Sequence, residues 1–132
     1  MDKNYLAQII ANDFEGLQMI SAYSAGAKVK VADIKYLASN KVFLLSIQRT
    51  KVETEQKDKE INSICRFDFV DKVRSKNIDQ LNHDMVLELI GIDYLKNNND
   101  YEINLMFKNN AHITLVVEAL EILLEDQNEI NN

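Results

Sequence analysis

The sequence has no proline and no tryptophan, and its three glycines, Gly16, Gly26 and Gly91, stand far apart. Without clustered glycines the chain cannot form the phosphate-binding loops of Rossmann and P-loop proteins, which excludes both kinds of nucleotide site. The single cysteine, Cys65, cannot form a disulfide within the chain, which indicates a reducing compartment.

Long apolar stretches and basic stretches are also missing. The most apolar stretch, 113–124, is interrupted by Glu118 and Glu121, whereas a membrane-spanning helix needs about 20 apolar residues. No basic run followed by an apolar segment opens the chain, so we expect a cytoplasmic protein with no secretory leader and no membrane association. Its net charge is −6, and an acidic chain repels nucleic-acid phosphates, so we expect no nucleic-acid partner.

Catalytic and metal-binding patterns are equally scarce. His83 and His112 have no cysteine or acid at the spacing of a zinc site, so we expect surface histidines, no metal and no cofactor. Cys65 shares its expected strand face with Phe67 and Phe69, which is typical of a buried, inert thiol. The sequence supplies no catalytic residue, and we favour a role other than catalysis.

Periodic patterns account for most of the 132 residues and predict a single domain over 1–132, with its core at about 5–126. Helical spacing follows Asp13, a good N-cap, and predicts a helix over 13–25. Alternation predicts about six strands. They cover 28–37, 41–49, 64–74, 85–95, 101–108 and 111–117.

The segments between and after these strands complete the expected fold. Asparagine-rich turns at 97–100 and 109–110 favour hairpins, and 50–60 is a polar loop. Leu120, Leu123 and Leu124 suit a closing helix that ends near Asp126. The predicted class is α+β, mainly β: an antiparallel meander curling into a half-open barrel with an N-terminal and a C-terminal helix. A pleckstrin-homology-like barrel ends in the same way, and this analogy carries no function.

A scatter of residues across the chain resembles one bacterial family. They are Asp13, Leu17, Ile20 to Ala22, Val31, Asp33 and Tyr36-Leu37, then Phe43 to Arg49, Arg66-Phe67, Val70, Val73, Ser75 and Ile78, and finally Leu89, Ile92, Ile113 to Leu115, Val117-Glu118 and Glu121. The chain is similar over about 5–126 to the family known as domain of unknown function 2948, found mainly in alphaproteobacteria. The resemblance implies a cytoplasmic bacterial protein with no assigned activity, cofactor or catalytic residues.

The hypothesis we rank first is a binding or adaptor module that uses a polar, basic sheet face. Arg66 begins a basic row, and it would meet Arg49 if their strands were neighbours. The rest of the row is Lys72, Arg74 and Lys76. Such a face fits a protein partner or a small anionic ligand.

Two alternatives stay open. The first is a small-ligand-binding or enzymatic barrel, with Asp33, Tyr36 and Arg49 lining a polar pocket inside otherwise apolar strands. The second is a structural homodimer built on the last helix or an edge strand, so the chain is either a monomer or a homodimer. The candidate ligand-binding residues are therefore Arg49, Arg66, Asp33 and Tyr36.

Overall fold

A computed structural model of the chain describes residues 6–53 and 59–129, apart from the side chains of 128 and 129. Within these ranges the chain forms ten strands, one α-helix and two 3₁₀ turns. The helix is α1 (Phe14–Ser24), and the turns are η1 (Val31–Asp33) and η2 (Ala38–Asn40). The strands are β1 (Gln8–Ala11), β2 (Lys28–Lys30), β3 (Ile34–Leu37), β4 (Val42–Thr50), β5 (Glu60–Phe67), β6 (Val70–Lys76), β7 (Val86–Asn97), β8 (Asp100–Phe107), β9 (Ala111–Val117) and β10 (Ile122–Glu129).

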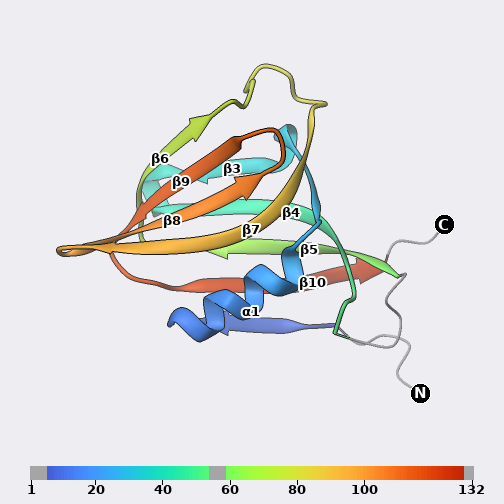
Figure 1. Cartoon of the computed structure of the whole chain (residues 1–132), viewed down its shortest axis with the longest axis horizontal. Helices are drawn as coiled ribbons and strands as arrows, with labels where there is room; N and C mark the ends of the chain where they lie inside the picture. The colour runs from blue at the N-terminus through green and yellow to red at the C-terminus, as the bar shows by residue number, and fades with distance from the viewer. Residues whose placement is uncertain (1–5, 54–58, 130–132) are drawn as a thin grey trace.

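All ten strands belong to one antiparallel sheet that curls back on itself (Figure 1). The strand order is β1-β10-β5-β4-β2-β7-β8-β9-β6, and β3 pairs with β4 off this path. The curl brings β6, at one end of the order, against β3. Here the Val70 amide donates to the carbonyl of Lys41, which follows η2, at 2.8 Å, and the Tyr36 hydroxyl of β3 donates to the Val70 carbonyl at 2.9 Å. We call the line along which β3 and β6 face each other the seam; it is joined at these hydrogen bonds and open beyond them.

The concave face of the sheet and the buried side of α1 enclose one apolar core. Strand residues alternate between core and surface, as in β9, where Ala111, Ile113 and Leu115 are buried. The helix begins as predicted, because the Asp13 side chain accepts from the Gly16 amide at 2.8 Å. It packs against β1, β4 and β7.

The prediction of about six strands was wrong, because two expected strands are each divided and two further strands exist. The alternation expected through 64–74 breaks at Phe69, whose φ of 59° turns the chain between β5 and β6. Phe69 is therefore exposed, and the next residue, Val70, is buried. The turn η1 divides 28–37 into β2 and β3 in the same way.

The expected C-terminal helix is also wrong, because this segment is strand β10, seated between β1 and β5. Its register places Leu124 opposite Cys65 on one side and opposite Ile9 on the other. Ile122, Leu124 and Asp126 point inward, as a strand requires. An acid at the third inward position hides this alternation in the sequence.

The sheet is not closed into a barrel, so the half-open barrel is confirmed only as a curled antiparallel sheet. The analogy with a pleckstrin-homology-like barrel is also wrong, because it depended on a final helix and the last element here is strand β10. Both asparagine turns are confirmed. Asn98 in one turn and Asn109 and Asn110 in the other have positive φ, although the register of the second leaves three loop residues instead of two.

Candidate functional site

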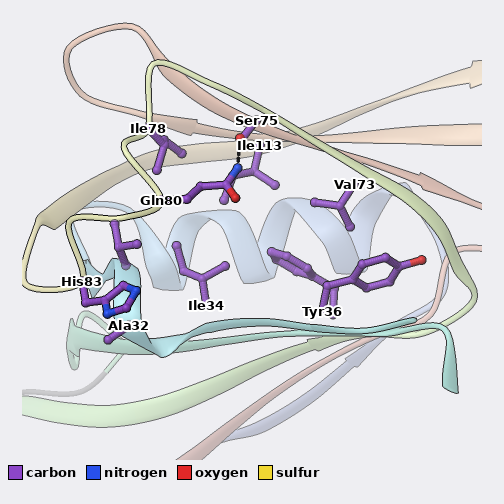
Figure 2. Close-up of a pocket in the computed structure, with 11 residues that line it drawn as sticks. Ala32, Ile34, Tyr36, Val73, Ser75, Ile78, Gln80, His83 and Ile113 are labelled. Atoms are coloured by element: carbon purple, nitrogen blue, oxygen red, sulfur yellow. Dashed lines mark hydrogen bonds between the residues drawn. The ribbon is translucent and has the colours of Figure 1, made fainter. Parts of the chain in front are cut away.

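A hollow of about 510 Å³ opens at the seam, which we call the seam cleft (Figure 2). It lies where β3 and β6 diverge, beneath the β6–β7 connection at 77–85. Its lining residues are Val31, Ala32, Ile34, Tyr36, Phe43, Val73, Ser75, Ile78, Gln80, His83 and Ile113. The cleft thus exists because the curled sheet stops short of closing.

The floor and walls of the cleft are apolar. Phe43 and Ile113 belong to the apolar core and are 1% and 3% exposed, and we call this buried part of the lining the floor. The half-buried side chains of Ile34 and Tyr36 rise from β3, and Val73 faces them from β6 (Figure 2). Strand alternation explains this wall, because every second residue of each edge strand points to the concave side.

The rim of the cleft is polar. Ser75 is at the end of β6, and Gln80 and His83 are in the connection that follows; all three are exposed. The Gln80 Nε2 donates a hydrogen bond of 2.9 Å to the Ser75 Oγ, drawn in Figure 2. The cleft therefore changes from apolar at its floor to hydrogen-bonding at its opening.

The rim segment 77–85 is fastened at both ends. The amides of Val31 and Ala32 donate to the carbonyls of Met85 and His83, at 2.9 and 3.1 Å. At the other end, the Asn77 Nδ2 donates to the Asn110 carbonyl at 2.7 Å. The cleft is a preformed feature of the fold, as most small-molecule sites are.

Of the four predicted ligand-binding residues, Tyr36 alone lines the seam cleft. Asp33 is exposed and lines a second hollow of about 540 Å³ on the outer face of the sheet. This outer groove forms where β2 leaves β4, since the two strands pair only at Lys28 and Gln48. Lys30 and Asn62 also line it, together with apolar residues such as Ile64 and Val86, so its walls are mixed.

Arg49 is buried within a closed set of hydrogen bonds. Its guanidinium donates to both oxygens of Asp126, at 3.0 and 2.9 Å, and to both oxygens of Glu53, at 2.9 and 2.6 Å. Ser63 Oγ donates to Asp126 at 2.6 Å, and the Arg49 guanidinium lies 5.4 Å from the Tyr23 ring centre. We call Arg49, Asp126, Glu53 and Ser63 the buried ion cluster.

The pKa values of this cluster follow from its burial and hydrogen bonds. Desolvation alone would raise the pKa of Asp126, but hydrogen bonds from Arg49, Ser63 and the Ala7 amide outweigh it and lower that pKa. The pKa of Glu53 is also lowered, because the hydrogen bonds and charge of Arg49 outweigh desolvation. Both carboxylates are thus held ionised, and Arg49 is fully occupied by them.

Arg66 does not meet Arg49. In the β4–β5 register Arg66 pairs with Leu44 and Arg49 pairs with Ile61, so the two lie at opposite ends of these strands. Arg66 also points outward, where its Nε donates to Asp68 at 2.9 Å. The basic row continues on the outer face of β6, at Lys72, Arg74 and Lys76, and Arg74 pairs with Glu102.

The Cys65 thiol is buried in the core. Burial raises the pKa of the Cys65 thiol to about 12, which keeps it protonated near neutral pH. Within residues 6–53 and 59–129 no three of His, Cys, Asp and Glu gather as metal ligands. No helix in that part of the chain is long and apolar enough to cross a membrane.

The sequence reasoning missed the rim of the cleft and the partners of Arg49. His83 was interpreted as a surface histidine in a polar turn, Ser75 entered only through the family resemblance, and Gln80 carries no signal beyond ordinary loop polarity. The available signal was the pair of apolar residues Val73 and Ile78, which alternate with Ser75 and Gln80 along the sequence, because apolar residues in a polar segment indicate packing on an apolar surface.

Comparison with known proteins gives one match. A family model described as "Protein of unknown function (DUF2948)" matches residues 7–131. No curated protein and no solved structure matches the chain.

Proposed function

The chain belongs to the DUF2948 family, and we propose that it is a small-molecule-binding protein whose seam cleft holds a ligand with an apolar body. The observation that carries the proposal is the preformed hollow with buried apolar residues at its floor and exposed polar residues at its rim. That combination is the usual form of a small-ligand site, and the volume of about 510 Å³ falls in the usual range of roughly 300–1,000 Å³.

The energetics favour a ligand that fills the floor. The Tyr36 ring and the side chains of Ile34 and Val73 are only half-buried, so a ligand would remove further apolar surface from water. Each Å² of apolar surface so removed contributes about 25 cal/mol. Tyr36 links this proposal to the barrel-pocket alternative, whereas Arg49 is occupied inside the buried ion cluster and Asp33 faces the outer groove.

The first test is native mass spectrometry of protein purified gently from bacterial cells. We expect the protein to carry an additional mass of about a few hundred daltons, which is the mass of a small ligand. Fluorescence titration with the neutral apolar dye Nile red then measures binding to the emptied protein.

A pair of ring-adding variants locates the site. Val73→Phe fills the cleft from β6 and should abolish both the bound mass and dye binding. Val86→Phe adds the same ring in the outer groove and should leave both unchanged. Thermal unfolding confirms that each variant folds. Equal binding by a folded Val73→Phe protein and the unchanged chain would refute the proposal.

A further inference from the structure

The rim chemistry narrows the class of ligand, and this step rests on the proposed function. We infer that the ligand is an amphipathic carboxylate, with its apolar part on the cleft floor and its carboxylate hydrogen-bonded by Ser75 and Gln80. Three features of the cleft support a carboxylate: the protons that these two side chains leave unused, the burial gradient from floor to rim, and the charges at the edges.

The hydrogen bond between Gln80 and Ser75 leaves donors available. If the Gln80 Nε2 donates, as placed, the Ser75 hydroxyl proton and the second amide proton remain. If the amide is turned over, Ser75 donates to Gln80 and both amide protons remain. Either arrangement offers two protons side by side, and no acceptor for them is found among the side chains that the structure describes.

A carboxylate matches two adjacent donors better than an alcohol does. It accepts through two oxygens, and hydrogen bonds to an ionised acceptor are about twice as strong as neutral ones. His83, on the same rim, supplies one more N–H in either tautomer. Since all three groups are exposed and the floor is buried, the ligand must enter with its apolar end first.

Charge at the edges of the seam favours an anion. The edge strands carry exposed Lys35 on β3 and exposed Lys72 and Lys76 on β6. The acid on β6, Asp71, is already paired with Lys41 at 3.0 Å. Asp79 and Asp84 of the rim segment offset part of this field, and the Asp79 Oδ1 accepts from the Leu81 amide. One negative charge on the ligand fits this balance better than a positive one.

The test compares two probes with the same alkyl chain, decanoate and decanol, by isothermal titration calorimetry below the micelle concentration. We expect decanoate to bind about tenfold more tightly than decanol. The double variant Ser75→Ala with Gln80→Leu should weaken decanoate binding about tenfold and leave decanol binding unchanged. Thr114→Ala removes a hydroxyl from the outer face of β9 and should change neither.

The outcomes separate this inference from the proposed function. Equal binding of both probes, or decanoate binding that the double variant does not weaken, overturns the carboxylate while the cleft remains a ligand site. If neither probe binds and Val73→Phe also leaves Nile red binding unchanged, both proposals fall. Tighter decanoate binding that depends on Ser75 and Gln80 supports both.

Discussion

At the scale of single residues, the buried ion cluster is the most demanding feature of the fold. The side chains of Arg49 and Asp126 are 0% exposed, and that of Glu53 is 6% exposed. Burying such charges is costly unless every one is paired and hydrogen-bonded, and here both carboxylates share one guanidinium. Removing one partner would leave the guanidinium charge inside with fewer contacts than its burial requires.

We therefore expect Asp126→Asn to lower the free energy of unfolding by about 3–5 kcal/mol at pH 7. Glu102→Gln, which breaks the exposed pair with Arg74, should cost less than about 1 kcal/mol. Urea unfolding followed by circular dichroism measures both. The pH dependence gives an independent reading, because the folded-state pKa values of Asp126 and Glu53 are lowered.

A lowered pKa means that the unfolded chain binds more protons than the folded one in acid. The contribution of the two carboxylates is therefore complete above about pH 4–5 and is lost as the pH falls through their folded pKa values. Asp126→Asn should flatten the fall of stability between about pH 5 and pH 2. An unchanged slope in the variant would show that Asp126 is not ionised in the folded protein.

The sequence alone could not show that the residues of the buried ion cluster pair with one another. Arg49 was singled out as a polar residue inside an apolar strand. One of its partners, Asp126, lies 77 residues away on a strand predicted as a helix, and the other, Glu53, lies in a segment predicted as a polar loop. The spacing of three leucines predicts a helix there, and Asp126, an acid at an inward position, breaks the alternation by which a strand would be predicted.

At the scale of elements, β10 carries the largest correction. A helix would place Leu120, Leu123 and Leu124 on one face, whereas the strand separates the last two. Leu124 is 0% exposed and Leu123 is half-buried on the other side. The two neighbouring leucines therefore report directly on which element forms.

We expect Leu124→Ala to cost about 2–5 kcal/mol, as for other fully buried leucines. Leu123→Ala should cost less than about 1 kcal/mol, because it removes little buried surface and leaves the register intact. Chemical unfolding of the two variants under one set of conditions measures the difference. Equal losses would favour the helix and contradict the strand.

The elements that could be predicted are those with local chemical signals. Asp13 fixed the start of α1, and the asparagine turns fixed the hairpins on both sides of β8. Strand β1 had no such signal, since it is four residues long and its Ile10 is 68% exposed. It exists because β10 offers an edge to pair with, and that pairing depends on the tertiary structure and not on the local sequence.

At the scale of the whole molecule, the seam determines both how far the sheet closes and where the ligand-sized cleft lies. It is joined where Val70 contacts Lys41 and Tyr36, and it is open toward Ser75. No sequence pattern states that β3 and β6 face one another, because that depends on the order of all the strands between them. The cleft was therefore beyond prediction. Of the three residues expected to line one polar pocket, Tyr36 lines the cleft, and Asp33 and Arg49 do not.

The Tyr36 hydroxyl should be what holds the seam at its joined end. We expect Tyr36→Phe to lower the stability by about 1 kcal/mol and to speed hydrogen exchange of the Val70 amide. The control is Tyr101→Phe, which removes a hydroxyl from β8, where the ring lies tilted against that of Tyr94 with the centroids 5.7 Å apart; it should leave that exchange rate unchanged. Measurement by NMR would contradict this role if both variants exchanged alike at Val70.

The pairing of β1 with β10 also constrains how the protein is made. Gln8 lies opposite Glu125, 117 positions later, so β1 pairs with a strand that is synthesised long after it. Contacts of such long sequence separation slow folding. During synthesis β1 and the β10-facing edge of β5 must wait unpaired, and unpaired edges invite association between nascent chains. The sheet can therefore be completed only after β10 has left the ribosome, and chaperone demand should rise with the rate of initiation.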